Sequence, residues 1–325
     1  MLYPFTFHPI FKERVWGGRR LEELYGKQLP PGKRIGESWE ISDRPGDVSV
    51  IRNGPLAGKD LHWLTENHAP ELLGELPPLN GGRFPLLVKI LDAQEKLSLQ
   101  VHPPAHKARE LGGEPKTEMW YIAEAAPDAE LFVGLRRGVT RDRFEKDIET
   151  GTVAECFHRM KVAKGDAMFL PSGRVHAIGA GLVIFEIQQN SDTTYRVFDW
   201  NRVGLDGKPR ELHVGPSLES IDFEDFEPGL VSANTSELGG GTHVTLVESA
   251  LFKASLLAQR RAGSMTMTRG MFRIIGVVNG KTVVSTGAET IELGKGGFCL
   301  VPASVKRHDI WFEAGTSILV VEPGR

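Results

Sequence analysis

Four polar side chains occur at spacings that would let them bind one divalent metal ion. Gln100 and His102 are two residues apart in a β-like run, so they share one face of a strand. Glu118 begins a second β-like run, and His176 follows a sharp turn further along the chain. Two neutral imidazoles, one carboxylate and one amide oxygen suit a divalent first-row metal such as zinc. We therefore expect these four residues to be metal ligands.

Such a site would also attract a negatively charged substrate. A divalent cation with one carboxylate ligand keeps about one net positive charge, which would stabilise an oxyanion on a bound substrate. Lys116 is two residues before Glu118 and would share its strand face. Arg196 lies in a polar run that directly follows an apolar strand. Because both side chains are normally cationic, they are candidate partners for a phosphate or an oxyanion.

The segment that carries His176 has a distinctive pattern of turn residues. Residues 165–176 read GDAMFLPSGRVH, in which Gly165 marks a strand start and Pro171 and Gly173 force a turn before the histidine. The segment resembles the second half of the metal-binding signature of the cupins, which are small β-barrels. Ala180 stands where that signature often has asparagine. The resemblance implies that the turn directs His176 into the mouth of a barrel.

A weaker copy of this pattern lies near the C-terminus. Residues 296–308 read GGFCLVPASVKRH, but the turn glycine is absent and the histidine comes one residue later. We interpret the copy as a second cupin barrel without a metal site. The alternative is that two unrelated β units share common turn residues.

Short apolar runs separated by glycine and proline predict a mainly β protein with a few short helices. The pattern around Asn279–Gly280 predicts a hairpin with a type I′ turn. The polar, glycine-rich residues 224–242 suit a linker. The expected strands are residues 84–91, 96–101, 119–123, 130–133, 167–170, 182–187, 244–248 and 254–258; the expected helices are residues 20–25, 61–73 and 141–148, with one further turn within 105–111.

Composition limits the possible partners. The net charge of −3 gives no basic surface for nucleic acid, and no apolar run is long enough to span a membrane. The first residues lack the pattern of a signal peptide, so we expect a cytoplasmic protein. Cys156 and Cys299 both have apolar neighbours, so two buried free thiols are expected rather than a disulfide.

Several segments together resemble one enzyme family, the type I phosphomannose isomerases, in their short bacterial form. They are LSLQVHP, KTEMWY, PSGRVHAIGAG and EIQQNSDTTYRVFDWNR, with VWGG and GESWEISD near the N-terminus. The resemblance implies a zinc-dependent enzyme that interconverts mannose 6-phosphate and fructose 6-phosphate through an enediol or enediolate.

The family resemblance also assigns roles along the chain. It implies metal ligands at Gln100, His102, Glu118 and His176, and catalytic roles for Arg196 and Lys116. Further residues expected to line the substrate site are Lys89, Ser98 and Glu186. Residues 1–235 would form a catalytic cupin domain with helical segments, and residues 236–325 a cupin-like β domain without a metal site.

Two other functions fit the same residues. Two histidines and one carboxylate also describe the iron site of an oxygenase, although the polar, cationic rim favours an anionic sugar. A sugar-binding cupin with a vestigial site is the other alternative. The expected partner is a phosphorylated hexose, and the expected state is a monomer or a weak homo-oligomer.

Overall fold

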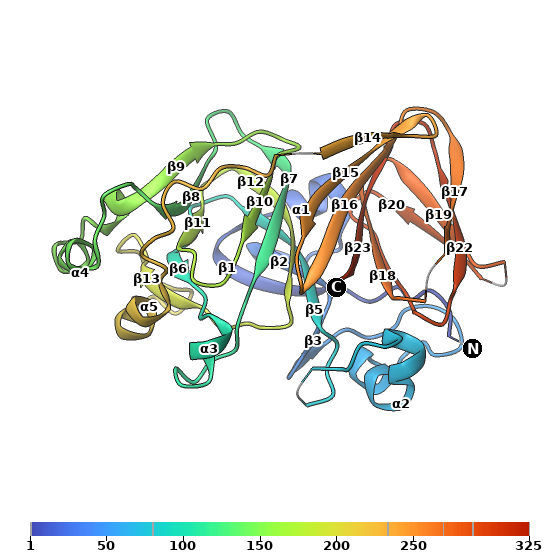
Figure 1. Ribbon diagram of the computed structural model, residues 1–325, viewed down its shortest axis with the longest axis horizontal. Coiled ribbons are helices and arrows are strands. Elements are labelled where there is room, and N and C mark those ends of the chain that lie inside the picture. The colour runs from blue at the N-terminus through green and yellow to red at the C-terminus, as the bar shows by residue number, and fades with distance from the viewer. Residues whose placement is uncertain (1, 80, 233, 269, 288, 325) are drawn as a thin grey trace.

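Two pairs of antiparallel sheets form the computed structural model, which describes residues 2–79, 81–232, 234–268, 270–287 and 289–324 (Figure 1). In hydrogen-bonding order, the six-stranded sheet of the first pair contains β1 (Ile10–Gly18), β2 (Ile35–Ile41), β5 (Leu86–Ala93), β12 (Leu182–Gln189), β7 (Glu118–Ala125) and β10 (Ala167–Leu170). The five-stranded sheet that faces it contains β13 (Tyr195–Phe198), β6 (Leu99–Val101), β11 (His176–Ile178), β8 (Glu130–Leu135) and β9 (Phe157–Lys161).

The second pair lies on the orange and red side of Figure 1. Its larger sheet contains β14 (Asn234–Leu238), β15 (Gly241–Glu248), β16 (Phe252–Gln259), β23 (Thr316–Pro323), β18 (Arg273–Asn279) and β21 (Phe298–Val301). Its smaller sheet contains β17 (Gly263–Thr268), β22 (Arg307–Phe312), β19 (Lys281–Ser285) and β20 (Thr290–Gly294). A short ribbon pairs β3 (Asp43–Arg44) with β4 (Asp47–Val48).

The helices are few and short, as the sequence predicts. They are α1 (Arg20–Tyr25), α2 (Leu61–Leu73), α3 (Ala105–Ala108), α4 (Arg141–Thr150) and α5 (Val214–Ser220), with the 3₁₀ turn η1 (Val153–Cys156). In the described parts of the chain, no helix combines the length and the apolar character needed to cross a membrane. The predicted mainly β fold is confirmed. Among the described strands, hydrogen bonds do not join the two sheets of either pair into one closed ring.

Strand alternation separates two surfaces of the six-stranded sheet in the first pair. On β5, Leu91 and Ala93 pack between the paired sheets, whereas Val88 and Ile90 belong to a core shared with the second pair. Both faces of β5 are therefore buried, and its sequence has adjacent apolar residues rather than strict alternation. In the shared core, the rings of Phe185 and Phe298 lie 5.5 Å apart.

Two local predictions are wrong. The strands flanking Asn279–Gly280 do not form a hairpin, because β18 pairs with β21 and β23 while β19 pairs with β20 and β22. Gly280 has a φ of 77°, but Asn279 does not share the positive φ that a type I′ turn needs. The chain crosses here from one sheet to the other, because buried residues of both strands line the core between these sheets.

The predicted linker at residues 224–242 is only partly a loop. Residues 234–238 form β14, which pairs with β15 across a turn at Gly239 and Gly240. The sequence of β14 lacks the apolar alternation by which strands were predicted, because this edge strand is largely exposed and needs no apolar face. Cys156 and Cys299 are buried free thiols, as predicted.

Candidate active site

The side chains of His102, Glu118 and His176 meet inside the first sheet pair. Their candidate ligand atoms all lie within 4.8 Å of one another, and all three residues are buried. Glu118 Oε2 is 3.5 Å from His102 Nε2, and Glu118 Oε1 is 3.4 Å from His176 Nε2. The predicted ligands separated by many residues in the sequence are therefore neighbours in space.

Strand positions explain how these residues come together. Glu118 is the first residue of β7, and its side chain shares the inner face of that strand with Trp120. His176 is the first residue of β11 and pairs with Gln100 on β6. The turn between β10 and β11 is hydrogen-bonded to the segment that carries His102: the backbone N–H of Gly173 donates to the His102 carbonyl over 2.9 Å. Gly173 has a φ of 94°, which explains the glycine in this turn.

The hydrogen bonds of the two imidazoles leave a metal-binding nitrogen on each ring. His102 Nδ1 lies 2.8 Å from the carbonyl oxygen of Thr193, and His176 Nδ1 lies 2.9 Å from that of Arg174. A carbonyl only accepts, so each Nδ1 carries the proton and each Nε2 keeps a lone pair directed at Glu118. Backbone carbonyls commonly orient metal-ligating histidines in this way.

Unpartnered buried atoms give an independent test of metal binding. Among the described residues, His102 Nε2 and Glu118 Oε1 are buried without a hydrogen-bond partner, while Glu118 Oε2 has the Lys116 ammonium 2.9 Å away. Leaving such atoms unsatisfied is costly, and together they form a compact set of N and O donors. These donors fit a divalent metal of the zinc type.

Gln100 lies beside this triad but presents its amide differently from the prediction. Its Nε2 is 3.2 Å from His176 Nε2, while its Oε1 accepts a hydrogen bond from Ser98 Oγ over 3.3 Å. A half-turn of the amide would direct the oxygen toward the imidazoles. Gln100 is therefore placed to be the fourth ligand after that rotation.

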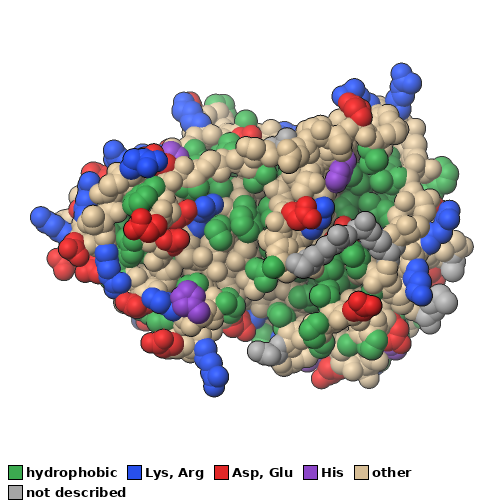
Figure 2. All heavy atoms as spheres, in the orientation of Figure 1, with side chains coloured by type: hydrophobic (Ala, Val, Ile, Leu, Met, Phe, Trp, Pro, Cys, Tyr) green, Lys and Arg blue, Asp and Glu red, His purple; other side chains and the backbone are tan. Residues whose placement is uncertain are grey.

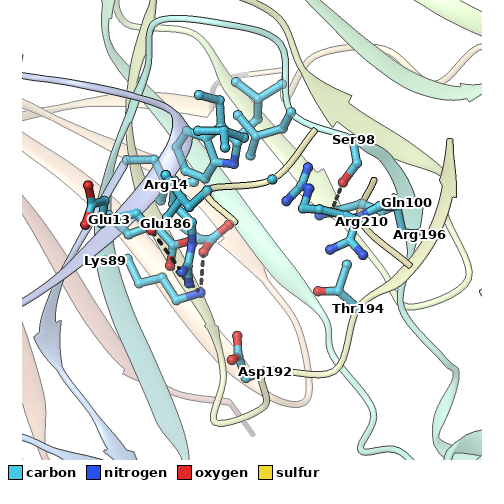
Figure 3. Close-up of a pocket in the computed structure, with 18 of the residues that line it drawn as sticks. Glu13, Arg14, Lys89, Ser98, Gln100, Glu186, Asp192, Thr194, Arg196 and Arg210 are labelled. Carbon is cyan, nitrogen blue, oxygen red and sulfur yellow. Dashed lines mark hydrogen bonds and ion pairs between the residues drawn. The ribbon is translucent and has the colours of Figure 1, made fainter. Parts of the chain in front are cut away.

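A cavity of about 560 Å³ adjoins the site at Gln100 and is lined by all five of the other predicted residues. Figure 3 shows Ser98, Gln100 and Arg196 on one side of it, and Lys89 and Glu186 on the other. Arg196 on β13 pairs directly with Gln100 on β6, so strand register places it beside the candidate ligand. Lys116 also lines the cavity, and its Nζ is 2.9 Å from Glu118 Oε2.

A buried group of charges forms the cavity wall opposite Arg196. Lys89 Nζ lies 3.3 Å from Glu186 Oε2 and 3.7 Å from Glu37 Oε2. Trp120 Nε1 donates to Glu186 over 2.9 Å. Arg14 Nε is 2.7 Å from the other oxygen of Glu37. The wall therefore alternates positive and negative groups, which suits the hydroxyl groups of a sugar.

Sequence reasoning did not identify several residues of this cavity. Arg14 directly precedes VWGG, Glu37 lies within GESWEISD, and Arg210 follows β13. Glu37 and Trp39 are two residues apart on β2, and Trp39 Nε1 donates to Glu37 over 2.6 Å. That spacing was a usable signal for Glu37. No pattern in the sequence around Arg210 predicted that this residue lines the same cavity.

Burial and neighbouring charges set the protonation states. Burial lowers the pKa of His102 to about 3, so its imidazole is neutral. Burial would raise the pKa of Glu37, but Arg14 and Lys89 hold it at about 2. Burial and then repulsion by Glu118 raise the pKa of Glu186. For Glu118, Lys116 and His102 overcome the effect of burial and lower the pKa.

Comparisons with known proteins agree with this arrangement. The sequence model of the phosphomannose isomerase type I catalytic domain matches residues 5–119. The mannose-6-phosphate isomerase ManA of Bacillus subtilis is 38% identical over 304 residues, which cover 92% of this chain and 93% of that protein. The chain belongs to the mannose-6-phosphate isomerase family. The family resemblance seen in the sequence is thus confirmed.

Solved structures extend the likeness to the whole fold. The crystal structure of the mannose 6-phosphate isomerase from Bacillus subtilis has a TM-score of 0.89 and 33% identity, and the match covers 98% of this chain and 99% of that one. A zinc-bound mannose 6-phosphate isomerase shares the fold, with a TM-score of 0.80 and 17% identity over the full length of both chains. These family members have the same overall architecture as this chain.

Proposed function

We propose that the chain is a zinc-dependent aldose–ketose isomerase that interconverts mannose 6-phosphate and fructose 6-phosphate. The observation that carries the proposal is the convergence of His102 Nε2, His176 Nε2 and Glu118 on one buried point, next to a cavity lined by both basic and acidic side chains. Family relatives named for this activity, and a zinc-bound member of the fold, support the choice of reaction and metal.

Four residues would hold the metal. His102 and His176 would bind it through Nε2, Glu118 through its carboxylate, and Gln100 through its amide oxygen. When bound, the metal supplies positive charge that polarises the substrate and stabilises negative charge on its oxygens. The hydrogen bonds from Nδ1 of each histidine to a backbone carbonyl fix the ring orientations in advance.

The reaction moves a proton between C1 and C2, through an enediol or enediolate. We assign Lys116 as the residue that carries this proton, because its Nζ lies at the cavity wall beside the metal site. Arg196 would stabilise negative charge on the phosphate or on the enediolate. Lys89, Ser98 and Glu186 would bind the sugar hydroxyls, since their polar atoms line the same cavity.

The halves of the chain have different parts in this proposal. Residues 1–235 would be the catalytic domain, since they supply every residue named above. Residues 236–325 would form the β domain without a metal site; their buried His308 lies outside the His–Glu–His cluster found among the described residues. The shared core around Phe185 and Phe298 ties the two domains together.

An isomerase assay on fructose 6-phosphate, combined with metal analysis, tests the function. Exhaustive chelation should abolish formation of mannose 6-phosphate, and added zinc should restore it. Activity in protein free of metal would contradict the proposal. Bound iron together with oxygen consumption would instead favour the oxygenase, and sugar binding without turnover would favour the binding protein.

A further inference from the structure

The carboxylate of Asp199, at the end of β13, binds two arginines at once. Arg210 Nε donates to Oδ2 and Arg210 Nη2 to Oδ1, each over 2.6 Å. Arg202 Nε donates to Oδ1 over 2.9 Å. Asp199 is only 5% exposed, and its pKa is lowered because these bonds outweigh the effect of burial. The carboxylate is therefore a fixed, ionised anchor for both guanidinium groups.

The anchored Arg210 lies on the cavity wall next to Arg196. Both side chains line the cavity, whereas Asp199 is not part of its lining (Figure 3). The Nε–Nη2 edge of Arg210 is occupied by Asp199, which leaves both hydrogens of Nη1 and the second hydrogen of Nη2 available to a ligand. Arg196 Nη1 donates to the Glu211 carbonyl over 2.7 Å, while its Nε is buried without a partner among the described residues.

Two acidic residues near these arginines, Asp206 and Glu211, form no side-chain ion pair with either of them among the described contacts. Asp206 also lines the cavity, but its Oδ1 accepts a hydrogen bond from the backbone N–H of Lys208 over 3.0 Å, within its own loop. Glu211 contacts Arg196 through its backbone carbonyl and does not line the cavity. The wall at this end therefore presents two guanidinium groups, which suit a phosphate.

A strained turn brings Arg210 back to Asp199. Trp200 and Asn201 have φ values of 56° and 54°, which are unusual for residues other than glycine. The Trp200 indole holds this turn, because its Nε1 donates to the Leu97 carbonyl over 2.7 Å. The chain then closes a small loop through the bridge between Val203 and Pro209. Such strain persists only where the surroundings over-determine the conformation, often at functional sites.

We propose that Asp199 is a positioning residue that fixes Arg210, so that Arg210 and Arg196 together bind the phosphate of the substrate. This inference rests on the proposed function, because it takes the ligand to be a phosphorylated hexose. A guanidinium already held by a carboxylate loses little freedom when it binds an anion. The strained turn thus builds one end of the cavity as the phosphate end.

Steady-state kinetics with inorganic phosphate as a competitive inhibitor test this assignment. Arg210→Gln should raise both the KM for mannose 6-phosphate and the inhibition constant of phosphate about tenfold, with kcat changed by less than about threefold. Arg210→Lys should recover part of the loss. Metal content should be unchanged in both variants. Arg137→Gln is the matched control, since the Arg137 side chain is 76% exposed and does not line the cavity.

The positioning role of Asp199 predicts that the effect of replacing it depends on the presence of Arg210. Asp199→Asn should raise the same two constants, and adding it to Arg210→Gln should cause little further loss, because both changes remove one interaction. Fully additive losses in the double variant would overturn the positioning role. An inhibition constant within about twofold of wild type in Arg210→Gln would overturn the phosphate assignment. If Asp199→Asn does not fold, the two Arg210 variants alone decide the phosphate assignment.

Direct binding separates this inference from the proposed function. Calorimetric titration of the metal-loaded protein with inorganic phosphate requires no turnover. If the wild type binds phosphate more tightly than Arg210→Gln but does not isomerise the sugar, the proposed function fails and the anion site stands. If turnover is normal and phosphate binds both proteins equally, the anion site fails alone.

Discussion

Lys116 Nζ lies 2.9 Å from Glu118 Oε2, and both side chains are buried. The carboxylate that would bind the metal therefore also holds the ammonium group at the cavity wall. The two residues are only two positions apart, at the start of β7, so their side chains lie on the same face of the chain. The ion pair therefore depends on local chain geometry. The proposed proton carrier and the proposed metal site are thus linked through one carboxylate.

Replacing Lys116 should separate proton transfer from metal binding. Lys116→Met should lower kcat at least about a hundredfold, because a positioned acid–base group typically contributes that much. Its metal content should match that of the wild type, since the substitution leaves all four ligands. Exchange of the C2 proton of mannose 6-phosphate in heavy water measures the step directly. Undiminished exchange in Lys116→Met would rule out this lysine as the proton carrier.

Removing one ligand should abolish tight metal binding. His176→Gln takes away an imidazole whose Nε2 faces Glu118, so we expect zinc affinity to fall by more than about a hundredfold. Replacing a residue that only orients a ligand typically costs about 10- to 100-fold. Zinc titration followed by thermal unfolding measures this without reference to activity. His106→Gln is the control, because His106 is exposed on α3. Equal stabilisation of both variants by zinc would contradict the ligand assignment.

Both the positive charge and the planar guanidinium group of Arg196 should contribute to turnover. Arg196→Ala should reduce kcat/KM at least about a hundredfold, since it removes a charged donor facing an anionic substrate. Arg196→Lys should be intermediate, because it retains charge but loses the fork of donors. Kinetics with mannose 6-phosphate distinguish the two variants. Turnover within about twofold of wild type in Arg196→Ala would show that the assignment is wrong.

His308 should make stability depend on pH in the second sheet pair. Burial, followed by repulsion from Arg273, lowers its pKa to about 4 from the ordinary 6.5. Between these values the unfolded chain binds a proton that the folded chain does not, so stability falls as pH drops from 6.5 to 4, by at most about 3 kcal/mol. His308→Leu should lack this component. Denaturant unfolding of both metal-free proteins at several pH values checks the difference, and parallel pH profiles would contradict it.

The shared core should make both halves unfold together. Phe298 is 7% exposed and packs against Phe185, so Phe298→Ala should lower the free energy of unfolding by about 3–5 kcal/mol. Trp311→Ala, at a residue that is 54% exposed, should cost much less. Release of bound zinc and loss of secondary structure should occur in one transition in each protein. Zinc release unaffected by Phe298→Ala would show that the halves are independent.

The sequence predicted what local patterns determine. Periodicity identified α2 with its observed bounds, and the proline–glycine turn before His176 does bring that side chain beside His102 and Glu118. What it missed depends on contacts between distant segments. The crossing between β18 and β19 follows from two facing sheets, which the Asn279–Gly280 dipeptide alone does not reveal.

The cavity shows the same limit. Arg210 reaches its wall only because a strained turn at Trp200 folds the chain back onto Asp199, and no short motif encodes that return. Residues supplied by regular strands, such as Lys89 on β5 and Glu186 on β12, could be anticipated. Residues supplied by an irregular loop could not, since their position depends on tertiary contacts.

The apolar outer face of the β5, β12 and β7 sheet has a consequence for how the chain can change. That face is covered by β15, β16, β18, β21 and β23, which contribute none of the proposed ligands. Selection on this covering layer would therefore act on shape rather than on chemistry. An enlarged side chain at Phe185 would require a smaller one at Phe298, so substitutions that never touch the substrate should still be accepted only in matched pairs.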